Sequence, residues 1–240
     1  MNKLYSVVIP VLNEEDNIAK LLEEIQVTFM SINESNYEIL CIDDSSTDAT
    51  NKVLVNAKST INNLRVLQHQ HRSGQSAALR TGFLNANGKL IITLDGDGQN
   101  NPIDIPVLIK LYMHNKSPLI CGIRIKRQDT AIKKISSYIA NAVRSAILND
   151  GIRDTGCGLK LFERELILRI PFFNHFHRYI PALVKREGYN YATVAVHHRH
   201  RNNGISKYGT LDRLVAGIID LLGMLWLRLR FRNTGKIIEK

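Results

Sequence analysis

The sequence has 240 residues, of which 44% are hydrophobic and 22% charged, enough to bury a sizeable core in one domain with a distinct C-terminal tail. Lysine and arginine exceed aspartate and glutamate by 32 to 22, so the formal net charge is +10. This charge implies an anionic partner, and nucleic acid, anionic lipid and a nucleotide diphosphate all fit it. A membrane-spanning helix is excluded at Leu214–Leu227, because that apolar run is too short and carries Asp220.

The cysteines argue against a secreted, disulfide-bonded protein. Cys41, Cys121 and Cys157 are odd in number and far apart, and the first two lie in apolar, strand-like runs. We therefore expect buried, reduced thiols and a cytoplasmic location. No signal peptide is expected, since a short strand follows Met1–Lys3 directly.

Strands and helices alternate four times in the first 100 residues. Asn13 is expected to cap the first helix, and further helices should begin near Asp48 and Gly74. The alternation predicts an α/β fold, with a mostly parallel central sheet and helices on both faces. In such sheets ligands bind beyond the carboxyl ends of the strands. The predicted strands are Tyr5–Val11, Glu38–Ile42, Leu64–Gln68 and the run that begins at Leu90.

The fourth strand ends in a group of oxygen-bearing side chains. An apolar run from Leu90 to Leu94 is followed by Asp95, Asp97 and Gln99, which are separated only by glycines. Their oxygens can converge on one side of an extended segment. Such oxygens are the ligands that Mg²⁺ or Mn²⁺ prefers, so we predict a metal site here. The alternative is a solvated, glycine-rich surface turn, which the preceding buried strand disfavours.

Two other strands also end in polar residues. Asn13 and Glu14 follow the first strand, and Asp43 and Asp44 follow the second. Because parallel strands end at the same edge of a sheet, these groups should gather beside the metal motif. A purely structural role does not predict such a gathering.

After Gln99 the pattern is less regular. Asp154–Lys160 contains two glycines that suit a tight backbone conformation rather than a regular element, and Arg199–Gly209 reads as a basic, glycine-punctuated loop. The other expected elements are helices at Ile105–Met113 and Ile132–Leu148, a strand at Leu119–Gly122, a basic loop with Arg124, Lys126 and Arg127, a helix from His177 to about Glu187, and a strand at Tyr191–His198.

These segments together resemble a known enzyme family. Residues 9–15, 42–48, 73–83 and 95–99 are similar to the inverting GT-A glycosyltransferases of family 2. Residues 154–160, His177–Arg178 and 204–209 resemble its polyprenyl-phosphate branch, the bacterial dolichol-phosphate mannosyltransferase-like enzymes. The resemblance runs from Ser6 to about Arg230, without the paired C-terminal transmembrane helices of longer members.

The resemblance implies a GT-A (Rossmann-like) domain over residues 1–209 and a metal-dependent, inverting transfer of a sugar. The donor would be a GDP- or UDP-linked sugar and the acceptor a polyprenyl phosphate of the dolichol or undecaprenyl type, at the inner face of the cytoplasmic membrane. It implies a catalytic group of Asp97, Asp154, Arg201 and Lys207. It implies a Mg²⁺ or Mn²⁺ site of Asp95, Asp97 and Gln99. It implies nucleotide-sugar contacts from Pro10, Leu12, Asn13, Glu14, Asp43, Asp44, Gln75, Arg80, Asp95, Arg124, Arg178 and Ser206.

The acceptor decides how much acid–base chemistry is needed. A phosphate monoester has a second pKa of about 6 and is largely ionised at neutral pH, so a polyprenyl phosphate needs no strong general base. The alternative is a soluble or cell-envelope saccharide acceptor, which needs a base that the sequence does not identify. A basic nucleic-acid-binding module is a remoter alternative, and the acids at the strand ends argue against it. A zinc site at Cys157, His197, His198 and His200 lacks the usual ligand spacing.

The tail, residues 210–240, predicts an amphipathic helix that docks on the membrane surface or on a membrane-protein partner. Trp226 suits an interface, and Arg228, Arg230, Arg232 and Lys236 follow without an acid among them. The alternative is that the helix simply packs on the catalytic domain. The predicted apolar stripe consists of Leu214, Ile218, Leu221, Leu222, Leu225 and Leu229.

Overall fold

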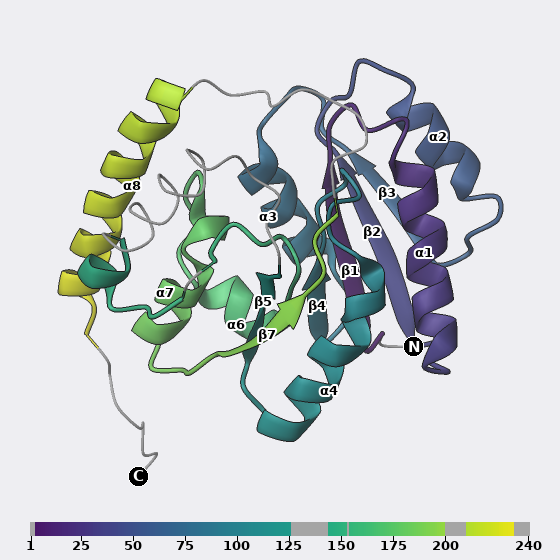
Figure 1. The fold of residues 1–240 in the computed structure, drawn as a ribbon. Coiled ribbons are helices and arrows are strands. Elements are labelled where there is room, and N and C mark those ends of the chain that lie inside the picture. The colour runs from purple at the N-terminus through teal and green to yellow at the C-terminus, as the bar shows by residue number, and fades with distance from the viewer. Residues whose placement is uncertain (1–2, 126–143, 153, 200–209, 233–240) are drawn as a thin grey trace, which may run out of the picture.

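The structure is a computed structural model that describes residues 3–125, 144–152, 154–199 and 210–232. The described residues form a seven-stranded sheet in the order β3-β2-β1-β4-β6-β5-β7 (Figure 1). The strands are β1 (Tyr5–Val11), β2 (Tyr37–Asp43), β3 (Leu64–Gln68), β4 (Leu90–Thr93), β5 (Leu119–Arg124), β6 (Lys160–Glu163) and β7 (Ala192–Val196).

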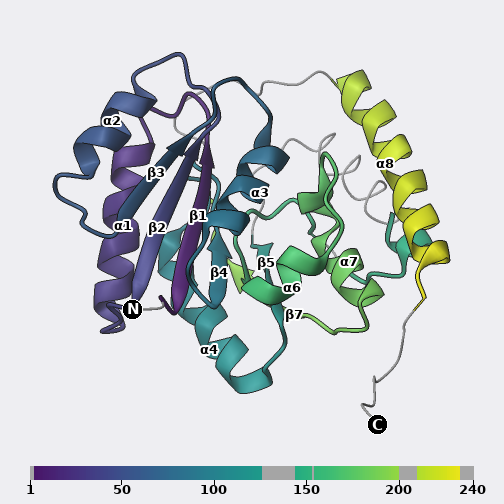
Figure 2. The ribbon, with the colours of Figure 1, turned by 180° about the vertical axis from the view of Figure 1, so that it is seen from behind.

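Helices cover both faces of the sheet, as predicted (Figures 1 and 2). Alternate residues of β1 explain the two layers: Val7 and Ile9 pack in one core with Leu21, whereas Val8 packs in the other with Phe83. The first core lies under α1, α2 and α4, and the second under α3, α6, α7 and α8. The helices are α1 (Ile18–Ser31), α2 (Thr50–Ala57), α3 (Gln75–Asn85), α4 (Ile105–Asn115), α6 (Arg164–Arg169), α7 (Ile180–Arg186) and α8 (Thr210–Arg230), with 3₁₀ turns η1 (Pro102–Asp104) and η2 (Phe176–Arg178).

Strand β6 was not predicted. It pairs antiparallel with both β4 and β5, while the other paired strands are parallel. Since β6 runs against its neighbours, its first residue, Lys160, lies at the edge where β4 and β5 end. The expectation of an irregular segment is therefore wrong at Lys160, because a four-residue strand carries no readable alternation and depends on partners distant in sequence.

The start of the first helix also differs from the prediction. Helix α1 begins at Ile18 with Asn17, not Asn13, at its N-cap position, and Asn13 adopts a left-handed backbone with φ 53°. Its side-chain oxygen accepts a hydrogen bond from the Thr47 backbone at 2.8 Å instead of capping a helix. Asn13 thus ties the loop after β1 to the loop after β2. Of the helix predicted at residues 132–148, only residues 144–148 are described, and these are helical.

Helix α8 carries apolar side chains on two faces. Met224 is 2% exposed and packs with Leu221 and Leu227 against the second core. Leu221 and Leu222 differ by 100° around the helix, so they cannot share a narrow stripe, and the predicted stripe is wrong for Leu221. Among the described residues, no helix is long and apolar enough to cross a membrane. The outward face consists of Ile218, Ile219, Leu222, Trp226 and Leu229, each more than half exposed.

All three cysteines are buried and free, which confirms the expected reduced thiols. Burial of the Cys121 thiol raises its pKa to about 12. The boundary predicted between residues 209 and 210 adjoins residues outside the description and stays a prediction.

Candidate active site

The loops after β1 and β2 form one side of the carboxyl edge. Asp43, fully buried, accepts hydrogen bonds from the Ser46 backbone at 2.9 Å and from the amides of Asn51 and Gln68 at 3.3 and 3.2 Å. Buried Glu14 accepts a hydrogen bond from the Asn17 amide at 2.8 Å. The predicted donor contacts of these loops therefore lie together, next to Pro10 and Leu12 at the end of β1.

Asp44 shapes the segment that leads into α3. Its two oxygens accept hydrogen bonds from the backbones of Ser73 and Gly74, at 2.8 and 2.7 Å, and His69 Nδ1 lies 2.8 Å from Oδ1. These contacts place Gln75, the first residue of α3, at the sheet edge. Gln75 Nε2 donates to Asp95 Oδ1 at 2.9 Å, so the edge at β2 is linked to the end of β4.

Asp95 and Asp97 follow β4, as predicted, and their electrostatics suit a cation. Burial, and then the nearby negative charge of Asp97, raise the pKa of Asp95 to about 6. Asp97 Oδ1 accepts a hydrogen bond from the Gln99 backbone at 3.1 Å, which turns the chain after the motif. Two neighbouring carboxylates whose negative charge the surrounding groups do not fully offset suit a hard divalent ion. Within the described ranges, no group of three or more His, Cys, Asp or Glu side chains could hold a metal, so further ligands would have to come from Gln99, water or a bound phosphate.

Gly158 brings a second loop against this motif. A Cβ atom at Gly158 would lie 2.2 Å from Asp95 Oδ2 and 2.7 Å from Asn100 Oδ1, far inside van der Waals contact. Only glycine therefore allows the loop of residues 154–158 to touch the Asp95 carboxylate. Asn100, which the sequence analysis missed, is 2% exposed and accepts a hydrogen bond from the Asp95 backbone at 3.1 Å.

A pocket of about 170 Å³ lies beside Asp95, between the start of α3, the loop of residues 155–158 and η2. Lys160 and His177 line it and had no assigned function from the sequence. Lys160 is 4% exposed, and its ammonium donates to the Cys157 carbonyl. A lysine two residues after Gly158, with apolar residues on both sides of it, was the available signal. Arg178, a predicted donor contact, also lines the pocket and is exposed at its rim.

Arg124 and Asp154, two predicted site residues, bind each other. Arg124 Nε and Nη2 donate to the two oxygens of Asp154, each at 2.7 Å, and the Arg124 backbone donates to Oδ2 at 3.2 Å. Asp154 is only 5% exposed, so the pair is a charge-assisted, bidentate bridge between β5 and the glycine loop. Their roles toward a ligand stay predictions.

The segment after β7 is joined to the metal motif. The Arg199 backbone donates to the Gln99 carbonyl at 3.0 Å, and the Arg199 guanidinium binds Glu24 of α1 at 2.8 and 2.9 Å. His197 Nδ1 lies 2.8 Å from Asp104 Oδ1. The basic loop of residues 199–209 thus starts beside the predicted metal ligands. Arg80, further along α3, lies 5.5 Å from the Phe172 ring. Arg201, Ser206 and Lys207 lie outside the described residues.

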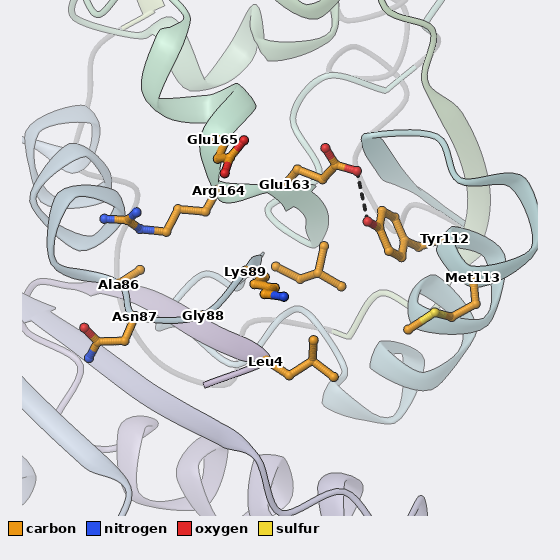
Figure 3. A pocket seen from close by; sticks show the side chains of 11 residues that line it. Leu4, Ala86, Asn87, Gly88, Lys89, Tyr112, Met113, Glu163, Arg164 and Glu165 are labelled. Carbon is orange, nitrogen blue, oxygen red and sulfur yellow. Dashed lines mark hydrogen bonds between the residues drawn. The ribbon is translucent and has the colours of Figure 1, made fainter. Parts of the chain in front are cut away.

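A second pocket, of about 660 Å³, lies at the opposite edge of the sheet, where β1 and β4 begin (Figure 3). Its side chains include Lys89 and Arg164 on one side, with Tyr112 donating to Glu163 at 2.9 Å on the other. None of the motifs singled out from the sequence reaches this pocket. The site residues predicted from the sequence lie instead at the carboxyl edge, although the pocket there is smaller.

Solved structures with the same architecture are known. Glucosyl-3-phosphoglycerate synthase from Mycobacterium tuberculosis, in complex with Mn²⁺, uridine diphosphate and glucosyl-3-phosphoglycerate, matches with a TM-score of 0.70 at 20% sequence identity, covering 97% of this chain and 82% of that one. Its complex with Mg²⁺ and uridine diphosphate has a TM-score of 0.69 at 20% identity, with coverage of 97% and 82%. At this identity the likeness concerns the fold, and it confirms the predicted GT-A architecture.

Two relatives are more similar in sequence. Dodecaprenyl-phosphate galacturonate synthase of Rhizobium johnstonii is 35% identical over an alignment of 228 residues that covers 92% of this chain and 66% of that protein. Undecaprenyl-phosphate 4-deoxy-4-formamido-L-arabinose transferase of Photorhabdus laumondii is 32% identical over 221 residues, 92% of this chain and 67% of that protein. The chain thus spans about two thirds of the length of these relatives. The model of Glycosyl transferase family 2 matches residues 6–170, so this chain belongs to that family, as its motifs predicted.

Proposed function

We propose that this chain transfers a sugar from a nucleotide-sugar to the phosphate of a polyprenyl phosphate. The observation that carries the proposal is the pair Asp95 and Asp97, crowded at the carboxyl end of β4 between the donor-side loops and a cation-lined pocket. The names of the two relatives support a lipid phosphate as the acceptor.

The donor is assigned to the loops after β1 and β2. Asp43 and the segment from Pro10 to Glu14 would receive the base and ribose, because they lie at one end of the edge, with the metal motif next to them on β4. The diphosphate would then lie against Asp95 and Asp97. This order leaves the pocket on the β6 side for the sugar and the acceptor.

Asp95, Asp97 and Gln99 are assigned to a Mg²⁺ or Mn²⁺ ion. When bound, such an ion offsets the negative charge that develops on the leaving diphosphate. The fit rests on this chain's own electrostatics, since a cation between two crowded carboxylates relieves the repulsion that raises the pKa of Asp95.

The acceptor phosphate is assigned to the pocket beside Asp95. Lys160 and Arg178 supply positive charge there, and His177 supplies a neutral ring. A phosphate that is already ionised can attack without a protein base, which agrees with a pocket in which Asp95 is the only acid lining it among the described residues. A saccharide hydroxyl would need such a base.

The experiment is a transfer assay with a panel of UDP- and GDP-sugars, Mn²⁺ or Mg²⁺, and undecaprenyl phosphate in detergent. Glycosylated lipid should form with one donor and disappear when EDTA is added. Soluble mono- and oligosaccharides form the parallel arm. Transfer to a saccharide but not to the lipid phosphate would replace this proposal with the saccharide alternative.

We also propose that the outward face of α8 docks on an anionic bilayer, at the cytoplasmic face of the membrane. Its apolar residues Leu222, Trp226 and Leu229 are 62%, 61% and 75% exposed, and Arg228, Arg230 and Arg232 adjoin them. Cations near an anionic leaflet contribute roughly 1 kcal/mol each. The inward face already holds the helix on the protein, so the outward face is left for a partner.

Flotation with liposomes containing anionic lipid tests this surface. The wild type should float, and a variant with Leu222→Ser, Trp226→Ser and Leu229→Ser should not. The matched control carries Val27→Ser and Met30→Ser, which are 65% and 73% exposed on α1 across the sheet, and it should float like the wild type. If the wild type stays behind at low salt, direct docking is wrong and a protein partner covers this face.

A further inference from the structure

Helix α8 is connected to the pocket by a short series of hydrogen bonds. Asp220, on α8, has its Oδ2 atom 2.8 Å from His175 Nδ1, and the two side chains are 16% and 28% exposed. His175 directly precedes η2, whose last two residues are His177 and Arg178. Both of these line the pocket beside Asp95. The helix proposed to meet the membrane thus holds the segment that supplies one wall of the site.

The backbone at His175 is held in an unfavourable conformation. Its φ is 64°, in the left-handed region that non-glycine residues seldom adopt. The His175 backbone donates to Ser76 Oγ at 2.8 Å, and Ser76 is 2% exposed in the first turn of α3. Such a conformation persists only where its surroundings enforce it, and here the contacts come from α3, from α8 and from Asn174 Oδ1, which accepts from the same backbone N–H at 3.0 Å.

Ser76 also contacts the ring of His177. Its hydroxyl oxygen accepts from the His175 backbone and lies 2.9 Å from His177 Nδ1, to which its one hydrogen can donate. Burial, and then the positive charge of Arg178, hold the pKa of His177 well below its ordinary value, so the ring is neutral. A neutral ring that accepts at Nδ1 carries its proton at Nε2 and presents an N–H donor.

We propose that Asp220 and His175 are positioning residues that hold His177 and Arg178 at the acceptor side of the pocket, so that α8 sets the affinity for the acceptor phosphate. The inference rests on the proposed function, because it needs the acceptor to lie on the β6 side of Asp95. Without the Asp220 carboxylate the His175 ring loses its partner, and the strained turn before η2 loses one of its restraints. His177 and Arg178 then shift. The metal motif and the loops after β1 and β2 stay in place, because none of their residues belongs to this series of hydrogen bonds.

The kinetic test uses Asp220→Asn, with His175→Asn as a second variant, because asparagine tolerates a left-handed backbone and keeps the turn foldable. Undecaprenyl phosphate in detergent serves as acceptor, which removes membrane docking from the assay, and the donor is the active sugar from the panel above. Both variants should raise the KM for undecaprenyl phosphate roughly tenfold, with the donor KM and kcat changed less than about twofold. Asp220→Glu should restore most of the affinity.

The matched control is Arg186→Gln. It removes other contacts at the C-terminal end of α8, namely the hydrogen bond from Arg186 Nε to the Leu227 carbonyl at 3.3 Å and the packing of Arg186 on the Phe231 ring at 4.3 Å, and none of these three residues lines the pocket. The acceptor KM of this control should equal that of the wild type. An equal rise in the control, or no rise in Asp220→Asn and His175→Asn, would overturn the proposal.

Histidine nitrogen NMR tests the same link without any assay of transfer. In the wild type, His177 should show the Nε2–H tautomer and stay neutral at pH 6. Asp220→Asn should change the His177 signals, and Arg186→Gln should leave them unchanged. If the wild type transfers sugar to no polyprenyl phosphate, the proposed function is wrong. If the His177 signals do not change in Asp220→Asn, the proposed link between α8 and the pocket is wrong.

Discussion

The two pairs of acids at the carboxyl edge differ in how their charge is satisfied. The donor-side acids, Asp43 and Asp44, each accept hydrogen bonds from backbone N–H groups and side chains that follow them in the chain. The metal-side acids, Asp95 and Asp97, crowd each other, and the pKa of Asp95 rises to about 6. A carboxylate that accepts several hydrogen bonds from the protein stabilises the loops around it. A carboxylate whose negative charge is not fully offset can instead bind a cation.

The difference has a structural origin. Asp43 and Asp44 lie at the end of β2, where the loop after β2, helix α2 and the segment between β3 and α3 supply their hydrogen-bond donors. Asp95 and Asp97 alternate with glycines, and the neighbouring loop approaches through Gly158, which has no side chain and therefore offers no side-chain donor.

The largest effect is expected for Asp97→Ala. Losing a metal ligand should lower kcat about 10³-fold, which is about 4 kcal/mol in the barrier. The unfolding free energy without metal should not fall, because the substitution removes a like charge beside Asp95. Steady-state kinetics with Mn²⁺ and urea unfolding in EDTA measure the two effects. Glu23→Ala, on the exposed side of α1, is the control. Full activity of Asp97→Ala at low Mn²⁺ would remove Asp97 from the metal site.

Asp44→Ala should mainly cost stability. Leaving the Ser73 and Gly74 backbones and the His69 ring without their acceptor should lower the unfolding free energy by about 3 kcal/mol. Urea unfolding measures it, and Glu23→Ala should stay within about 0.5 kcal/mol of the wild type. A loss as small as that of the control would mean that Asp44 is not a scaffold for the loop.

Gly158→Ala tests the close approach of the second loop. The added methyl group collides with the Asp95 carboxylate, so Mn²⁺ binding should weaken about tenfold, or about 1.4 kcal/mol. Calorimetric titration with Mn²⁺ measures the affinity. The control is Gly223→Ala in α8, where a Cβ meets nothing within 4 Å. Unchanged Mn²⁺ affinity in Gly158→Ala would show that the loop yields without moving Asp95.

The smallest effect concerns pH. The pKa of Asp95 in the folded protein, about 6, lies above its ordinary value of 3.8. The protonated form is thus favoured by folding, and the stability from this group is complete below pH 3.8 and lost as the pH rises through 6. Between pH 5 and 7.5 the metal-free wild type should lose about 1 kcal/mol relative to Asp95→Asn. Urea unfolding at both pH values measures it, and Mn²⁺ should reverse the loss only in the wild type. Parallel pH curves would contradict the raised pKa.

Much of the first half of the fold was predictable from local patterns. Apolar runs of strand length, each followed by turn residues or acids, placed β1 to β4 within a few residues of their observed bounds. The same reasoning missed the start of α1, because Asn13 binds Thr47, 34 residues further along the chain. A helix signal in the sequence cannot reveal that its capping residue has a distant partner.

The sequence by itself determined the class of the sheet, the edge where the predicted site residues gather and the acids of the proposed metal motif, because these depend on periodicity and on residues that directly follow a strand. The tertiary structure decided which groups meet there. It inserted β6 between β4 and β5 and thereby placed Lys160 at the edge. It also paired Arg124 with Asp154, brought His177 to the pocket and divided the apolar side chains of α8 between two faces. These outcomes depend on contacts between segments far apart in the chain, which no local pattern of residues encodes.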